Sequence, residues 1–390
     1  MARDGMNFPV VNTPRPLRSA LVCFSNLRWN ALFQRPQQLM SRFARQREVF
    51  FFEEPVRHEV ARLQITPCPV TGVQVVTPML PDPSDTAALR GALDLLLARS
   101  GPAAAWYCTP AALAFSDHVA WLAVAYDCVD GLPAEHEQAL FQAADVVFTG
   151  GPSLQAARKH SHGNIHCLPS GVDDEHFAAA RGLIREPEDQ MGLRRPLLGY
   201  SGVIDGRLDM DLLGRMAALR PDWHFAMIGP LMTPLPEAAN IHWLGEKAYA
   251  ELPAYMSHWD AALMPYARNQ ATRLLNPEEA PEYLAAGRRV VSTPVADVVR
   301  RFAGIEAVTI AEDAEGFVAA AEEAMMRADI SDFMDVDDYL ATITWDSVYD
   351  HVAALFSAAE RKAIAKFRRE SFASPQVAAR AVFPCGYWGD

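Results

Sequence analysis

Ser19-Ala20-Leu21-Val22-Cys23-Phe24 is an apolar run of strand length, and it begins the pattern that decides the fold. Pro36 then stands where a helix commonly begins, and residues 37–47 continue with apolar side chains at helical spacing. Val49-Phe50-Phe51-Phe52 follows as a second apolar run. A strand, a helix and a strand joined by short connections are typical of a parallel sheet.

The same alternation continues along the chain in two series. Further strand-like runs stand at 73–77, 104–108, 123–126, 145–149 and 165–168, with helical segments between them. A new series opens at Pro196-Leu197-Leu198-Gly199-Tyr200, after the polar stretch 186–195. We therefore predict an α/β protein with two Rossmann-like doubly wound domains, whose ligands bind at the carboxyl ends of the strands.

A chain of 390 residues is comfortable for two domains of this size. The divisions we expect are an N-terminal tail (1–17), a first Rossmann-like domain (18–180), a linker (181–195), a second Rossmann-like domain (196–344), and a long amphipathic helix with a tail (345–390) that returns to the first domain. This helix is basic toward its end.

The net charge of −13 argues against a general nucleic-acid-binding protein, which needs a basic surface. Residues 1–48 nevertheless contain eight arginines against only Asp4 and Glu48. They form either a face that meets anionic lipid or substrate, or a solvated face balanced by acids elsewhere. The six cysteines show no zinc or disulfide spacing, and no apolar stretch suits a signal peptide or a membrane span, so we expect a cytoplasmic protein without a metal site.

Two motifs indicate a family. The first is Cys167-Leu-Pro-Ser-Gly-Val-Asp-Asp-Glu-His-Phe177, and the second is Asn276-Pro-Glu-Glu-Ala-Pro-Glu-Tyr-Leu-Ala-Ala-Gly-Arg-Arg-Val-Val-Ser-Thr293. They resemble the interdomain signature and the donor-site run of GT-B glycosyltransferases, especially family 4. The resemblance spans roughly residues 19–356, with its parts in the family's order, and it implies two domains that face each other across a cleft.

The resemblance also implies a donor site in the second domain. The residue that matches the family's glutamate, Glu282, would accept hydrogen bonds from the ribose hydroxyls of the donor, as a carboxylate can from two hydroxyls at once. Gly202 lies in the segment that matches the family's glycine loop, where Arg207 is our candidate phosphate ligand. The other donor-site candidates are Lys247, Tyr266, Asn269, Thr272 and Arg273. The alternative for Gly202 is an ordinary turn, and for Arg207 a surface pair with Asp209.

Three residues depart from the family's pattern. Ser170 replaces an asparagine of the interdomain signature, Glu279 replaces a lysine, and Leu274 replaces a glutamate. A carboxylate at position 279 would repel a diphosphate unless an arginine compensates, for which Arg207, Arg268 and Arg273 are available.

In the first domain, Trp29 and Phe33-Gln34-Arg35-Pro36 resemble a signature of some capsule and exopolysaccharide transferases, so Trp29, Gln34 and Arg35 are candidate acceptor-binding residues. The alternatives are a packing role for Trp29 and the capping of surface acids by Arg35. Asp127 and Asp130 follow a strand and are candidates to orient or deprotonate the acceptor hydroxyl. Helix capping is the alternative role for both aspartates. His118 matches a region where many family members hold a histidine against the donor sugar, although a core or loop histidine fits its apolar neighbours.

The resemblance implies transfer of a sugar from a nucleotide-sugar donor, UDP- or GDP-linked, to a glycan or lipid-linked acceptor, in bacterial surface polysaccharide or glycolipid synthesis. It implies retention of configuration and no metal or other cofactor. An aspartate base in the first domain would instead fit inversion. The basic end of the last helix suggests peripheral contact with an anionic membrane surface. A weakly active nucleotide- or partner-binding module and a nucleotide-sugar epimerase remain alternatives.

Overall fold

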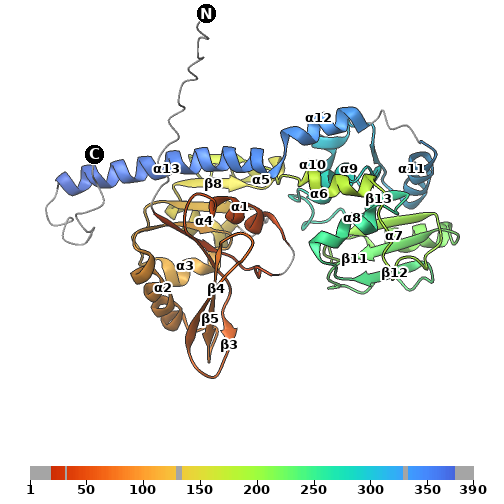
Figure 1. Cartoon of the computed structure of the whole chain (residues 1–390). Coiled ribbons are helices and arrows are strands. Elements are labelled where there is room, and N and C mark those ends of the chain that lie inside the picture. The colour runs from red at the N-terminus through yellow and green to blue at the C-terminus, as the bar shows by residue number, and fades with distance from the viewer. Residues whose placement is uncertain (1–18, 31–32, 129–133, 328–332, 374–390) are drawn as a thin grey trace, which may run out of the picture.

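The structure, a computed structural model, describes residues 19–30, 33–128, 134–327 and 333–373. Two sheets follow one another along the chain and lie in separate lobes (Figure 1). We call β1–β9 with α1–α5 the first domain, and β10–β15 with α6–α12 the second domain. The predicted α/β class with two Rossmann-like units is confirmed.

The described first sheet has the strand order β3-β5-β2-β1-β6-β7-β8-β9. β4 runs antiparallel to β5, and the other pairs are parallel. The strands are β1 (Ala20–Phe24), β2 (Val49–Phe52), β3 (Val56–Arg57), β4 (Arg62–Pro67), β5 (Gln74–Leu80), β6 (Ala103–Tyr107), β7 (Val124–Cys128), β8 (Val146–Thr149) and β9 (Ile165–Cys167). The helices are α1 (Arg35–Phe43), α2 (Thr86–Ser100), α3 (Leu113–Ser116), α4 (Ala134–Ala143) and α5 (Pro152–Arg158).

Both faces of the central strands of this first sheet are buried. Successive residues of β1 alternate between two cores, with Val22 and Phe24 in one and Leu21 and Cys23 in the other. Since neither face meets water, the central strands are continuous apolar runs, and that is why the sequence revealed them.

The second sheet is parallel and has the order β12-β11-β10-β13-β14-β15. Its strands are β10 (Leu197–Ser201), β11 (His224–Ile228), β12 (Ile241–Gly245), β13 (Ala261–Met264), β14 (Val290–Ser292) and β15 (Val308–Ile310). Its helices are α6 (Asp174–Ala178), α7 (Met210–Leu219), α8 (Leu252–Met256), α9 (Glu279–Ala285), α10 (Ala296–Phe302), α11 (Ala314–Met326) and α12 (Met334–Thr342). The strand order reverses direction between β10 and β13, the point where doubly wound sheets bind ligands.

The chain crosses between the domains twice, and the crossings lie side by side. The amide of Val172 donates to the carbonyl of Ile343 (2.9 Å), and the amide of Trp345 donates to the carbonyl of Val172 (3.2 Å). Phe177 and Ala180 pack in the core of the second domain, ahead of the boundary that we expected at residue 180. The reason is that α6 buries its apolar side against the second domain and not against the first.

The last helix, α13 (Trp345–Ala373), runs back along the first domain (Figure 1). Its Trp345, Tyr349, Val352 and Phe356 complete one of the two cores of the first sheet. The Tyr349 ring lies 5.0 Å from the ring of Phe43 in α1. This helix therefore covers part of one face of the first sheet that the first domain's own helices do not cover.

Five of the arginines near the N-terminus belong to the described residues and are paired with acids or buried. Arg42 pairs with Asp346 of α13 at 2.8 Å, Arg47 pairs with Glu360 at 2.9 Å, and Arg28 pairs with Glu53 at 3.1 Å. Arg45 also reaches Asp346, and Arg35 is buried. For these five arginines, the structure shows the second alternative that the sequence left open, in which acids elsewhere in the fold balance their charges.

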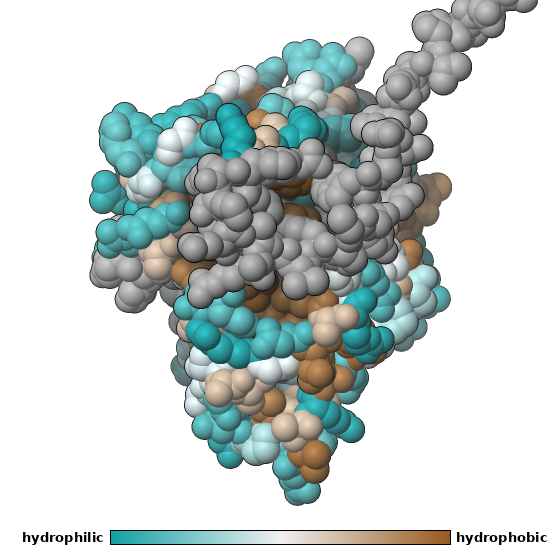
Figure 2. Space-filling view, turned by 90° about the vertical axis from the view of Figure 1, so that its left-hand side faces the viewer, coloured by the Kyte–Doolittle hydropathy of each residue, from teal (hydrophilic) through white to brown (hydrophobic). Residues whose placement is uncertain are grey.

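No helix in the described part of the chain is long and apolar enough to cross a membrane. Figure 2, which views the outer end of the first domain, shows hydrophobic side chains in scattered groups among hydrophilic ones. The basic end of α13, with Arg361, Lys362 and Arg369, stays a predicted membrane contact.

A glycine in the centre of β10 gives a prediction of stability. A Cβ atom on Gly199 would lie 2.0 Å from the ring of Trp259, which is fully buried. Overpacking of this kind commonly costs 1–3 kcal/mol, and we expect Gly199→Ala to lower the free energy of unfolding by about 3 kcal/mol in urea titrations. The control is Gly91→Ala in α2, where an added Cβ meets nothing within 4 Å and should not destabilise. Equal stability of both variants would contradict the packing described.

Candidate functional site

The loop after β10 lies at the switch point of the second sheet. The Gly202 amide donates to the carbonyl of Ile228 at 3.0 Å, so the loop begins against the end of β11. The neighbouring glycine, Gly229, has a φ of 129°, and a Cβ there would lie 2.1 Å from the Gly202 carbonyl oxygen. Two glycines thus let two strand-end loops touch, which places their backbone at the ligand-binding edge of the sheet.

Helix α9 packs directly against this loop. The hydroxyl of Tyr283 in α9 accepts from the Ser201 amide at 2.8 Å and donates to the Ser201 carbonyl at 3.1 Å. A Cβ on Gly202 would lie 2.9 Å from Glu279 Oε1 at the start of α9. The glycine loop and the helix that contains Glu282 therefore form one wall, as the sequence led us to expect.

Three carboxylates project from this wall toward different partners. Glu278 hydrogen-bonds Ser170, Glu279 accepts a hydrogen bond from Tyr266, and Glu282 lies among Glu278, Glu279 and Asp173. All three side chains keep some exposed surface yet are closely surrounded by protein atoms. This desolvation, with mutual repulsion, raises the pKa of each carboxyl above its ordinary value, most strongly for Glu282.

The raised pKa of Glu279 gives a prediction of pH dependence. In the unfolded chain the Glu279 carboxyl has its ordinary pKa of about 4.5, and in the folded chain its pKa is higher. The folded state therefore loses stability as the pH rises from about 4.5 through the higher, folded-state pKa. We expect Glu279→Gln to match the wild type near pH 4 and to be more stable at pH 8. Urea unfolding at both pH values measures this difference, and a Gln variant less stable than the wild type at pH 8 would disprove it.

Arg207 lies on the same wall but has a partner. Its guanidinium bonds Asp205 through Nε at 2.9 Å and Nη2 at 2.9 Å, so the surface pair with Asp209 is not observed. Asp209 instead caps α7 by accepting from the Leu212 amide. Arg207 remains partly exposed and lies within electrostatic reach of Glu279. It is thus placed to compensate the carboxylate that replaces the family's lysine.

The loop after β13 closes the other side of this switch point. Tyr266 is buried, and Leu208 forms a β-bridge with it. Asn269 Nδ2 donates to the Gly206 carbonyl at 3.0 Å, and Thr272 Oγ1 donates to the Ala267 carbonyl. The predicted residues Tyr266, Asn269 and Thr272 therefore gather beside the glycine loop and shape it.

Arg273 and Lys247 differ in whether their positive charges already have an acidic partner. Arg273 is exposed and has no ion-pair partner among the described residues. Lys247, after β12, pairs with Asp189 at 2.5 Å and lies 5.2 Å from the Tyr255 ring centre. Lys247 is therefore engaged by its own domain, whereas Arg273 keeps its charge open to a ligand.

In the first domain, Arg35 and Asp127 form a buried ion pair. Their side chains are 2% and 1% exposed, and Arg35 Nε donates to both carboxylate oxygens at 3.0 Å. Arg35 Nη1 donates to the Leu168 carbonyl at 2.8 Å, on the first crossing between the domains. Both side chains are buried and engaged with each other, so neither lies at a surface that an acceptor could contact, and both predicted roles are corrected: the pair supports the crossing.

Two other predicted residues of the first domain are engaged by contacts within their own domain. Trp29 is 4% exposed and packs on Phe51 with ring centres 5.0 Å apart, so it belongs to the core and not to an acceptor surface. His118 binds Asp94 of α2 at 2.8 Å, on the segment that leads into the amino end of β7. Since this end is opposite to the ligand-binding edge of a parallel sheet, His118 does not reach the donor.

Gln34 and Asp130 complete the predicted set. Gln34 is the N-cap residue of α1 and is half-buried. Its backbone N–H donates to Gln37 Oε1 at 3.3 Å. Its contact with an acceptor stays a prediction. Asp130 lies outside the described residues, and its catalytic role is likewise a prediction.

Tyr249 was not among the predicted site residues, but the structure brings it to the junction of the domains. Its ring stacks on His176 at 4.3 Å and lies 5.9 Å from Phe33 of the first domain. It also hydrogen-bonds Gln38 of α1 and lies near Glu282, and burial raises the pKa of its hydroxyl. The nearest segment that resembles the family ends at Lys247, two residues before Tyr249, so only the packing reveals this tyrosine.

The junction is further fixed by Asp297 of α10, which is fully buried. Its carboxylate accepts from the amide of Ser153 in α5 at 3.1 Å and from the Ser153 hydroxyl at 2.6 Å. A Cβ on the preceding Gly151 would collide with Asp297 Oδ2 at 2.5 Å. The two domains thus meet through close, hydrogen-bonded contacts on this side.

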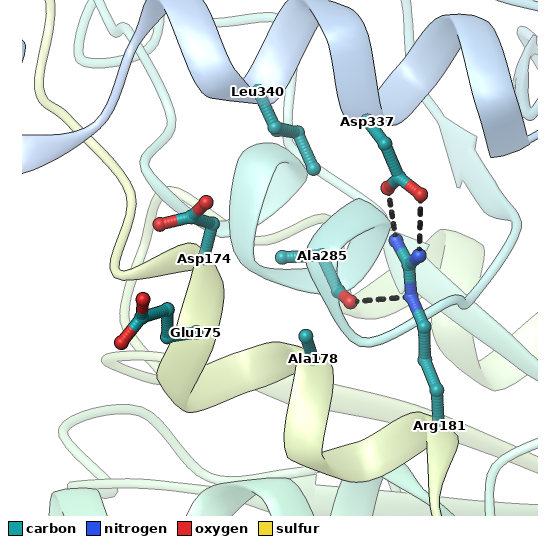
Figure 3. A pocket seen from close by; sticks show the side chains of 7 residues that line it. All are labelled: Asp174, Glu175, Ala178, Arg181, Ala285, Asp337 and Leu340. Atoms are coloured by element: carbon teal, nitrogen blue, oxygen red, sulfur yellow. Dashed lines mark hydrogen bonds and ion pairs between the residues drawn. The ribbon is translucent and has the colours of Figure 1, made fainter.

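A surface pocket of about 210 Å³ lies at the opposite end of α9 (Figure 3). Arg181 reaches across it, bonding Asp337 at 2.7 Å and donating to the carbonyls of Leu284 and Ala285 that end the helix. Asp174 and Glu175 also line it. With its arginine already engaged and three acids around it, this pocket does not suit an anionic donor.

Solved structures of other proteins superpose on most of this chain. HepE of Anabaena, solved in complex with UDP and glucose, superposes with a TM-score of 0.63 at 12% identity, over 86% of this chain and 99% of that structure. Sucrose-phosphate synthase of Thermosynechococcus elongatus gives a TM-score of 0.60 at 15% identity, over 92% of this chain and 100% of that structure. The chain has the GT-B fold. The resemblance predicted from the sequence is thereby confirmed at the level of the fold.

One curated protein is similar in sequence. It is the putative teichuronic acid biosynthesis glycosyltransferase TuaH of Bacillus subtilis, 26% identical over 219 residues, which cover 48% of this chain and 54% of that protein. The match thus spans about half the length of this relative. No protein-family model matches the chain.

Proposed function

We propose that this chain is a glycosyltransferase that moves a sugar from a nucleotide-sugar donor to a glycan or lipid-linked acceptor in bacterial surface polysaccharide synthesis. The observation that carries the proposal is the wall made by the Gly202 loop and Glu282, on a GT-B fold. The similarity to TuaH supports the reaction class and the setting, and HepE, which was solved with UDP and glucose, supports a nucleotide donor.

In this proposal, the second domain holds the donor, which is a UDP- or GDP-sugar. Glu282 accepts hydrogen bonds from the ribose hydroxyls, and the backbone at Gly202 approaches the diphosphate. Arg207 and Arg273 supply the positive charge that stabilises the departing diphosphate. Since Arg207 is shared with Asp205 and Glu279, its pull on the diphosphate is weaker than that of an unpaired cation.

We further propose retention of configuration, without a metal ion or other cofactor, at the cytoplasmic face of the membrane. The ion pair of Asp127 with Arg35 supports retention, because it removes one of the two aspartates that suited an inverting base. Asp130 and Gln34 remain the candidates on the acceptor side. Peripheral contact with anionic lipid rests on the basic end of α13.

A donor-hydrolysis assay tests the proposed function. The purified chain is incubated with UDP-glucose, GDP-mannose, TDP-glucose and ADP-glucose, and release of the nucleoside diphosphate is measured with Glu282→Ala as control. We expect slow hydrolysis of one donor, lost in the control and accelerated by glycan acceptors. Nucleotide binding without any turnover, or interconversion of sugars without release, would contradict a transferase.

A further inference from the structure

Glu278 is the carboxylate of the donor wall that contacts the crossing between the domains. It stands at the N-cap position of α9, and its Oε1 accepts a hydrogen bond from the hydroxyl of Ser170 on the first crossing. Ser170 is 4% exposed and departs from the family's asparagine. The two residues therefore form a contact that belongs to this chain and not to the pattern it resembles.

No cation in the described part of the chain forms an ion pair with Glu278. Arg35 lies within electrostatic reach of it, but the guanidinium is taken up by Asp127 and by the Leu168 carbonyl. Arg35 Nη2 is buried and lies 2.9 Å from Asp127 Oδ1. It nevertheless has no hydrogen-bond partner of suitable geometry among the described residues. Ser170 is the only donor to Glu278 in the described hydrogen bonds, and none of them uses the second carboxylate oxygen.

Glu278 lies on the side of the donor wall that faces the first domain, because its partner Ser170 belongs to the crossing between the domains. The proposed contacts to ribose and diphosphate are Glu282 and the Gly202 loop, both in the second domain. A sugar on the far side of the diphosphate extends toward the first domain, from which the acceptor approaches. Leu274, where the resembled family has a glutamate, packs against a core of the first domain and supplies no carboxylate there.

We infer that Glu278 accepts hydrogen bonds from hydroxyls of the transferred sugar, and that its negative charge stabilises the positive charge that develops on the anomeric carbon. Such stabilisation acts more strongly in the transition state than in the bound donor. Ser170 holds the carboxylate, and the buried Arg35–Asp127 pair fixes the crossing that carries Ser170. This inference rests on the proposed function and names the residue that faces the sugar.

Two variants separate this role from a merely structural one. Glu278→Gln keeps an oxygen that can accept from Ser170 but removes the charge, whereas Ser170→Ala removes the hydrogen bond and keeps the charge. If the charge acts on the sugar, Glu278→Gln should lower kcat about 100-fold and Ser170→Ala only a few-fold. The affinity for UDP or GDP, whichever nucleotide belongs to the donor turned over, should stay within about threefold in both variants.

The experiment measures kcat and KM with the donor that the wild type hydrolyses fastest, nucleotide affinity by calorimetry, and melting temperature. Glu315→Gln, an exposed residue at the start of α11, is the matched control. A Glu278→Gln variant with the kcat of the wild type would overturn the inference. Equal decreases of kcat in Glu278→Gln and Ser170→Ala, together with lowered melting temperatures, would also overturn it. A wild-type chain that turns over none of the four donors would overturn the proposed function itself, and this inference with it.

Discussion

Glu282→Ala is expected to weaken binding of the donor nucleotide about 100-fold. A hydrogen bond to a charged group contributes about 1.5–3 kcal/mol, and 1.4 kcal/mol corresponds to a factor of ten in the dissociation constant. In the proposal, the carboxylate accepts from two ribose hydroxyls, so its loss leaves both without their partner. Isothermal titration with UDP and GDP, in wild type and variant, measures the change.

The loss of affinity should come without a loss of stability. Glu282 lies among Glu278, Glu279 and Asp173, and burial and repulsion raise its pKa well above the ordinary value. Since the ionised form is unfavourable there, removing it at pH 8 should leave the melting temperature unchanged or raise it. Glu315→Ala is the control for loss of an exposed acid. Unchanged nucleotide affinity in Glu282→Ala would show that this carboxylate does not bind the donor.

Asp127→Ala is expected to destabilise the first domain by about 3–5 kcal/mol. The substitution leaves the guanidinium of Arg35, which is 2% exposed, without its counter-charge. Breaking a buried ion pair by removing one partner commonly costs this much, whereas replacing both partners by apolar residues costs far less. Urea unfolding followed by circular dichroism measures the difference.

The double variant Arg35→Met/Asp127→Leu is the matched control for this pair. We expect it to recover most of the stability lost in Asp127→Ala. It should not recover full transfer activity, because the Leu168 carbonyl loses the donor that fixes the crossing near Ser170. Stability of Asp127→Ala within 1 kcal/mol of wild type would contradict the buried pair.

The sequence was informative where strands are buried on both faces. β1, β2 and β10 are continuous apolar runs, and they were predicted within one or two residues. β4 was missed because it lies at the edge of the sheet and most of its residues are exposed, so it shows no apolar run. β15, a strand of three residues, was also missed.

The donor wall was predictable because its residues lie in two contiguous segments, one around Gly202 and one around Glu282. The first-domain residues were not. Arg35 and Asp127 stand 92 positions apart, and nothing in either segment shows that the two side chains neutralise each other. Trp29 and His118 likewise matched sequence signatures, but burial and the Asp94 contact decide their roles.

A crystal structure of the chain with UDP or GDP, whichever it binds more tightly, tests the central claim most directly. We predict the ribose within hydrogen-bond distance of the Glu282 carboxylate and the diphosphate against the backbone of the Gly202 loop. A nucleotide bound away from both elements, or no bound nucleotide at millimolar concentration, would contradict the account.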